Sequence, residues 1–184
     1  AIAFIAGVGA QALNNVTTGA IDTTTANFLV VAVGGDQNGT LTPSDSQTNT
    51  WTSLTVQEPA TNTRGRLWYV LNPTMSASHT FSVSGSGNFA VIMVLAFSGV
   101  ATTSAFDVEN GASNVSATSL AAGSITPSVA DEVIISAMCG NASQTNLTVN
   151  ESMTRQLHFP SGSVAKPGAM AYKIQTTATA INPT

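Results

Sequence analysis

The chain has 184 residues, enough for one domain with a sizeable core, and its composition excludes several classes of function. Charged residues make up only 8% of the chain, and the five lysines and arginines are scattered, so we expect no basic face for nucleic acid. Net charge is −4, and 60 serine, threonine and asparagine residues supply the polarity that charges usually give. The single cysteine excludes an internal disulfide, and no apolar run reaches the ~18 residues of a membrane span.

Short apolar segments separated by turn residues predict an all-β fold, a single antiparallel β-sandwich of jelly-roll-like type. The expected strands, in chain order, are Ile2–Ile5, Phe28–Val33, Trp51–Val56, Arg66–Leu71, Phe81–Gly85, Phe89–Phe97 and Val133–Met138. Of these, Phe28–Val33 and Val133–Met138 are nearly continuous apolar runs, which is typical of central strands covered on both faces.

Glycines are expected to end strands and to form turns, because they adopt positive φ without strain. Gly34-Gly35-Asp36 and Gly140-Asn141 should close the two central strands, and Gly7-Val8-Gly9 and Gly85-Ser86-Gly87 read as turns. Gly99–Ser119 is expected to be a connector, with a short edge strand around Phe106–Val108.

The second part of the chain repeats the first with heavy divergence. Ile21 aligns with Ile125, Ala32 with Ala137 and Tyr69 with Tyr172, at separations of 104, 105 and 103 residues. Such self-similarity indicates one structural unit used twice. We therefore expect one domain over residues 1–184, with repeat halves at about 19–98 and 123–184, a connector at 99–119, and strands of both halves sharing two sheets.

The second half contains no counterpart of the apolar run Phe89–Phe97. Three explanations are open: the natural chain continues beyond Thr184, the repeat is imperfect, or a neighbouring subunit supplies the strand. In the last case Ile2–Ile5 is the natural donor, because an uncovered sheet edge recruits strands.

The sequence offers no catalytic or metal-binding constellation, so we expect no enzyme, no catalytic residue, no cofactor and no metal. His79 and His158 have no other ligand-type residue at metal-binding spacing and are expected to be exposed or hydrogen-bonded. Cys139 follows an apolar run and is expected to be a buried, inert thiol.

The nine carboxylates likewise point to no reaction. Asp107 with Glu109, and Asp131 with Glu132, are close in sequence, but a glycosidase needs two carboxyl groups across a cleft, which spacing alone does not provide. The loop containing Asp36, Asn38 and Asp45 offers oxygen ligands for a hard cation, although Asx-turns are the preferred interpretation.

A few aromatic residues suggest a sugar-binding surface. Trp68, with Arg66 and Arg64 nearby to bind hydroxyl groups, is the candidate ligand-binding set; Trp51, Tyr69 and Tyr172 are the other members of this platform. The alternative is that Trp51 and Tyr69 are core residues of adjacent strands, and that alternation turns Trp68 to the other face.

Five segments together resemble a known class of proteins: Leu29–Val33, Ser44–Leu54, Leu67–Tyr69, Ala96–Gly99 and Phe106–Ala112. They are similar to a recurrent, poorly characterised class of jelly-roll-like β-sandwiches found in bacterial surface or secreted proteins and in tailed-phage virion proteins. In that class the region equivalent to Thr176–Thr184 leads into a Trp-containing strand and a final apolar strand. The resemblance implies fold and carries no catalytic residue.

These observations lead to one functional hypothesis and one alternative. The hypothesis is a non-enzymatic structural protein of a virion or extracellular particle, such as a capsid decoration or fibre subunit, whose partners are copies of itself or other particle subunits. The alternative is a carbohydrate-binding module that binds glycans through exposed aromatic residues.

Overall fold

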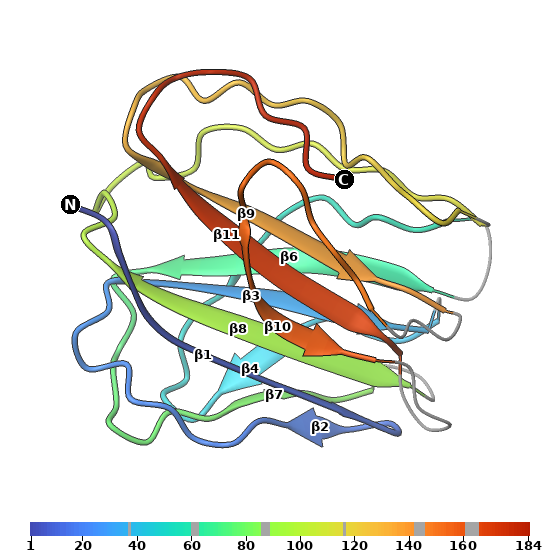
Figure 1. The fold of residues 1–184 in the computed structure, drawn as a ribbon. Coiled ribbons are helices and arrows are strands. Elements are labelled where there is room, and N and C mark those ends of the chain that lie inside the picture. The colour runs from blue at the N-terminus through green and yellow to red at the C-terminus, as the bar shows by residue number, and fades with distance from the viewer. Residues whose placement is uncertain (37, 60–62, 86–88, 116, 142–145, 161–165) are drawn as a thin grey trace.

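The computed structural model describes residues 1–184 except 37, 60–62, 86–88, 116, 142–145 and 161–165, and these described residues form antiparallel sheets without a helix (Figure 1). The strands are β1 (Ala3–Ala12), β2 (Val16–Thr17), β3 (Phe28–Gly35), β4 (Pro43–Asp45), β5 (Thr52–Ser53), β6 (Arg64–Leu71), β7 (Phe81–Val83), β8 (Ala90–Ser98), β9 (Glu132–Cys139), β10 (Thr154–Phe159) and β11 (Gly168–Gln175). They form three sheets, ordered β1-β8-β3-β6-β5, β2-β7-β4 and β10-β11-β9. The architecture is all-β, as predicted, and consistent with a β-sandwich.

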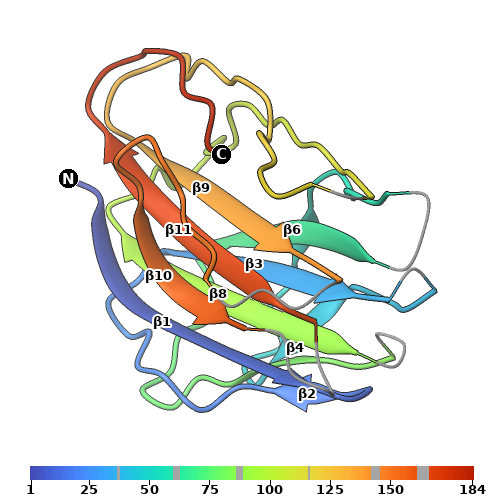
Figure 2. The same ribbon diagram turned by 45° about the vertical axis from the view of Figure 1, so that its right-hand side comes forward.

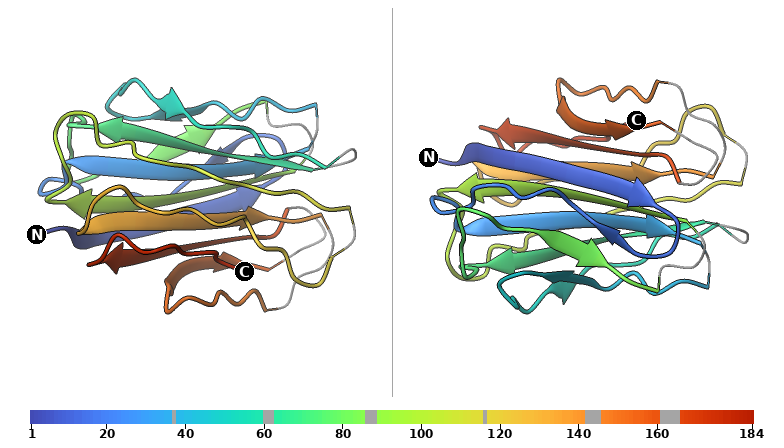
Figure 3. Two further views of the ribbon diagram at one scale, coloured as in Figure 1. Left: turned by 90° about the horizontal axis from the view of Figure 1, so that it is seen from above. Right: turned by 90° about the horizontal axis from the view of Figure 1, so that it is seen from below.

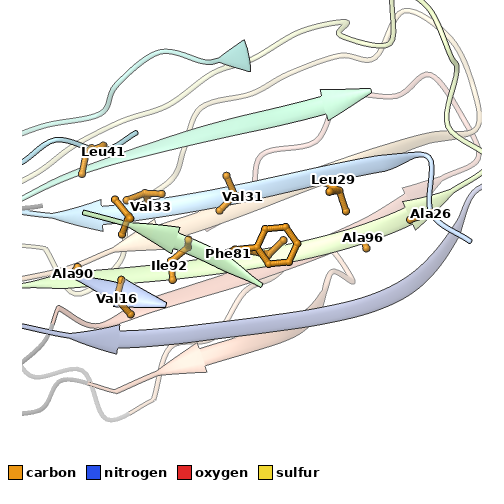
Figure 4. Close-up of a cluster of buried hydrophobic side chains, with 12 residues drawn as sticks. Val16, Ala26, Leu29, Val31, Val33, Leu41, Phe81, Ala90, Ile92 and Ala96 are labelled. Atoms are coloured by element: carbon orange, nitrogen blue, oxygen red, sulfur yellow. The ribbon is translucent and has the colours of Figure 1, made fainter. Parts of the chain in front are cut away.

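The five-stranded sheet is covered on both faces because its central strands, β3 and β8, are apolar on both faces. Leu29 and Val31 of β3 pack with Phe81 of β7 on one side (Figure 4). Val30 of β3 packs with Met170 of β11 on the other side, where β9, β10 and β11 lie over the sheet (Figure 2). The axes of the strands in the stacked layers are roughly aligned (Figure 3), as in aligned sheet packing. The predicted central position of Phe28–Val33 is confirmed.

The predicted central position of Val133–Met138 is wrong. The segment forms β9, which is the last strand of its sheet and pairs with β11 alone among the described residues. Val133 and Ile135 pack toward the central sheet, but Met138 remains 36% exposed. The apolar residues of β9 therefore contact the central sheet and also line a groove, described below.

The predicted turn at Gly7-Val8-Gly9 is a strand interior instead, whereas β3 does end at Gly35, within the predicted closing segment Gly34-Gly35-Asp36. Neither Gly34 nor Gly35 has a positive φ, and a Cβ at Gly34 would overlap Sγ of Cys139. β1 continues through Gly7 and Gly9, and a Cβ at Gly9 would lie 2.5 Å from the ring of Phe159. These glycines allow close approach of another layer rather than a change of chain direction. Gly85 does adopt a positive φ of 64°, whereas the following residues of that predicted turn lie outside the described part.

Other predicted elements differ in extent. Within Trp51–Val56 only Thr52–Ser53 forms a strand, and Phe106–Val108 is irregular rather than an edge strand. Strands of the two halves do not share sheets: β9, β10 and β11 form a sheet of their own. Ile2–Ile5 lies at the start of β1 and is paired with β8 of the same chain, so it is already occupied within its own sheet.

Residue pairings in the two halves correspond. Thr52 pairs with Tyr69 as Thr154 pairs with Tyr172, Ala32 with Leu67 as Ala137 with Met170, and Ile21 with His79 as Ile125 with Ile181. The sheet order β5-β6-β3 is likewise matched by β10-β11-β9. In the first half β8 follows on the far side of β3, whereas no described strand lies on the far side of β9.

The doubly covered sheet generates a stability prediction. Val31→Asp should lower the free energy of unfolding by more than about 4 kcal/mol, because it places an unpaired charge in a fully buried position. Ser53→Asp, on the exposed strand β5, is the matched control and should change it by less than about 0.5 kcal/mol. Chemical denaturation measures both values, and equal stability of the two variants would contradict the assignment of β3 to the core.

Candidate functional site

A large groove runs along the edge of β9 that has no partner strand among the described residues. Its volume is about 1040 Å³, at the upper end of the ~300–1,000 Å³ common for ligand sites. Residues of β9 that point to opposite faces, such as Ile134 and Ile135, both line it. The groove therefore follows the edge of the strand rather than one face of the sheet.

The walls of the groove come from segments far apart in the sequence. Val30 of β3 and Leu67 and Tyr69 of β6 form the inner wall, which is the part of the central sheet that β9 does not cover. Leu147–Val149 contributes to the outer wall, and Pro183 also lines the groove. A strand placed in the groove would thus be covered on both faces, as β8 is.

Exposed apolar side chains concentrate at this groove. Six large hydrophobic residues are exposed in the described part of the chain, and four of them line the groove: Phe106, Val108, Val115 and Met138. Contiguous exposed apolar surface commonly marks an interaction site. The groove is therefore suited to an apolar ligand or to a polypeptide segment.

The connector is bound to the central sheet at the rim of the groove. Oγ1 of Thr55 donates to Oε1 of Glu109 at 2.5 Å, and the Thr55 amide donates to Oε2 at 3.2 Å. The ring of Phe106 stacks on Tyr69, with 6.3 Å between centroids and 11° between planes. These contacts hold an irregular segment over β6 without a strand ladder.

Two carboxyl groups that line the groove, Asp107 and Glu132, influence each other. The Ser128 amide donates to Asp107 at 2.7 Å, and this hydrogen bond lowers the pKa of the Asp107 carboxyl. Partial burial, and then the negative charge of Asp107, raises the pKa of Glu132. The pair is on different elements but close in space, which the sequence positions of Asp107 and Glu132 did not indicate.

The predicted sugar-binding residues lie on one face of β6, at alternate positions. The guanidinium carbon of Arg66 lies 5.1 Å from the centroid of the Trp68 ring, and Nε of Arg66 donates to the Leu54 carbonyl at 2.7 Å. Arg64 contacts the Gly39 carbonyl and lies 3.9 Å from Glu58. Trp68 itself is half-buried against the core cluster, so its ring is flanked by protein atoms rather than fully presented to solvent.

The remaining platform residues occupy separate places. Trp51 packs on the same core cluster as Trp68, and its Nε1 donates to Oδ2 of Asp45 at 2.8 Å. Tyr69 faces the opposite side of the sheet, and Tyr172 stacks on Phe4 with 5.2 Å between centroids. Trp68 and Tyr69 do alternate, as expected, but Trp51 is on the side of Trp68 rather than that of Tyr69.

A buried polar network that sequence reasoning missed surrounds His79. Its Nδ1 lies 2.9 Å from Oγ1 of Thr23, its Nε2 lies 3.2 Å from Oδ1 of Asp45, and its ring stacks on Phe81 with 4.3 Å between centroids. The hydroxyl, imidazole and carboxylate have the composition of a nucleophilic triad, but Thr23 is fully buried and its hydroxyl also binds the Ser76 carbonyl. No substrate can reach it, so the network is structural. Nothing in the spacing of Thr23, Asp45 and His79 indicated it.

The structure also places three other residues considered in the sequence analysis: Asp45, Cys139 and His158. Asp45 accepts a hydrogen bond from the Gln47 amide at 2.8 Å, which confirms an Asx-turn there. Burial raises the pKa of the Cys139 thiol to about 12, which makes it unreactive as predicted. His158 lies in β10, where burial and then the charge of Arg155 lower its pKa.

The described residues contain no cluster of three or more His, Cys, Asp or Glu side chains able to hold a metal ion. Within the same part of the chain, no helix is present that is long and apolar enough to cross a membrane. Comparison with protein-family models, with curated proteins and with solved structures finds no match.

The His79 network predicts a large effect for one carboxylate. Asp45→Ala should lower the free energy of unfolding by about 3–5 kcal/mol, because it removes the carboxylate beside the buried His79 ring and leaves the Trp51 indole N–H without its acceptor. Asp22→Ala removes an exposed carboxylate that serves only a local turn and should have a much smaller effect. Thermal and urea unfolding compare the two, and similar losses would contradict the structural role of the network.

Proposed function

We propose that the protein is a non-enzymatic structural subunit of a virion or extracellular particle, and that it joins a neighbouring copy through the β9 groove. The observation that carries the proposal is an edge of β9 with no partner strand among the described residues, combined with a groove lined by exposed apolar side chains. Addition of a strand to such an edge supplies backbone hydrogen bonds along its length and apolar contacts on both faces.

The correspondence between the two halves supports this use of the groove. We propose that the chain is a jelly-roll-like sandwich built from two diverged repeats, in which the position beside β9 corresponds to that of β8 beside β3. Each pairing named above recurs 102 to 105 residues later in the second half. A strand supplied by a neighbouring subunit would occupy the position that has no described occupant.

The surface chemistry is also suited to close packing of copies. Charged residues are 8% of the chain, so few ions would have to be desolvated when two subunits meet. The carbohydrate-binding alternative is less well supported, because Arg66 lies over the Trp68 ring that would stack on a sugar. We therefore propose assembly rather than glycan recognition.

Concentration-dependent self-association tests the proposal. The wild-type chain should associate in sedimentation-velocity experiments, and Met138→Lys should weaken association by about tenfold or more, because it places a charge in the apolar groove. Leu13→Lys is the matched control, since Leu13 is 47% exposed but does not line the groove. Association of the control should be unchanged.

A wild-type chain that stays monomeric up to millimolar concentration would contradict the proposal. Equal effects of Met138→Lys and Leu13→Lys would contradict the choice of the groove. Chemical cross-linking followed by mass spectrometry locates the contact between subunits. Cross-links confined to the side of the molecule away from the groove would also contradict the choice of the groove.

A further inference from the structure

A buried lysine meets a carboxylate and a side-chain amide at one end of the stacked sheets. Nζ of Lys166 lies 2.9 Å from Oδ1 of Asp36 and contacts Oδ1 of Asn141. Lys166 is only 5% exposed. The three residues come from different elements, because Asp36 follows β3, Asn141 follows β9 and Lys166 precedes β11.

Local backbone contacts and packing hold this group together. The Gly140 amide donates to the Pro167 carbonyl at 3.0 Å, which fixes the neighbours of Asn141 and Lys166 beside each other. Two less polar groups lie beside Nζ: the ring centroid of Phe89 is 5.6 Å away, and the half-buried Cys139 is close by. Burial of a lysine is unfavourable unless its charge is compensated or removed.

The contacts match the requirements of an amide exchange. A lysine amine is a nucleophile once it is deprotonated, and a neighbouring carboxyl group can take up and return the proton. Nζ contacts the amide oxygen of Asn141, and that oxygen is bonded to Cγ, the carbon that the amine would attack. Contact between the reacting groups within one folded chain replaces a collision in solution by a reaction within one molecule.

We propose that Lys166 and Asn141 become joined by an intramolecular isopeptide bond, with Asp36 as the acid–base group. The ammonium of Lys166 first gives a proton to the Asp36 carboxylate. The free amine then attacks Cγ of Asn141, the Nζ–Cγ bond forms, and the Cγ–Nδ2 bond breaks.

Atoms and charges balance without a further reactant. The attacking amine loses a second proton, which passes to the departing nitrogen, so that one ammonia molecule leaves. Asp36 gives its own proton to that ammonia and returns to the carboxylate. No electron is gained or lost, and the product is a secondary amide that no longer requires a buried ammonium.

The bond would cross-link the end of β9 to the start of β11. These strands are neighbours, and the chain between them contains β10, so the cross-link would close a loop around that strand. Closing a loop restricts the unfolded chain and thereby favours the folded state. It would also strengthen the strand that borders the β9 groove.

Intact-mass spectrometry of the full chain tests the proposal. The wild-type chain should be lighter than its sequence by one ammonia molecule, and a proteolytic digest should yield one joined fragment that contains both Asn141 and Lys166. Asp36→Ala should keep the ammonia and yield separate fragments. A wild-type mass equal to that of the sequence would overturn the proposal.

Two control variants separate this bond from other losses of ammonia. Asn38-Gly39 and Asn110-Gly111 are sequences in which asparagine can lose ammonia by cyclising on its own backbone. Lys166→Arg should abolish the mass loss, whereas Lys173→Arg, which replaces the other lysine of the chain, should retain it. Retention of the loss in Lys166→Arg would assign it to cyclised asparagine and contradict the isopeptide bond.

Discussion

The structure depends on the burial of β3 and β8 on both of their faces. Because side chains alternate along a strand, a strand that is apolar throughout needs apolar partners above and below its sheet. Here β7 with its neighbours covers one face and β11 with its neighbours covers the other. The close approach of these layers requires glycine at positions such as Gly9 and Gly34, where any side chain would overlap the covering layer.

The same requirement explains the β9 groove. The sheet of β9, β10 and β11 covers only part of the central sheet, and the connector is held over the rest by Phe106 and Glu109. A groove lined mainly by apolar atoms therefore remains beside a strand edge whose backbone groups have no described partner strand. In the proposed assembly, one added strand would occupy the groove and would also pair with the backbone groups of β9. The Lys166 group lies at one end of the sheet that contains β9.

The sequence predicted the strands that have long apolar runs, because their burial is encoded in their own residues. It predicted their layers less well: Val133–Met138 has the composition of a central strand and is an edge strand. Local sequence patterns do not predict contacts between segments that are far apart in the chain. The His79–Asp45 pair and the β9 groove both depend on such contacts. Alternation along a strand is sufficient to predict that Arg64, Arg66 and Trp68 share one face of β6. The contact of the Arg66 guanidinium with the Trp68 ring depends on side-chain conformation, which alternation does not predict.

Amide hydrogen exchange followed residue by residue in NMR spectra of the monomer tests the central claim most directly. If β3 and β8 lie between two layers and β9 has a free edge, amides along β3 and β8 should all exchange slowly, whereas alternate amides of β9 should exchange much faster than those facing β11. Uniform protection along β9, or fast exchange throughout β3, would contradict the account.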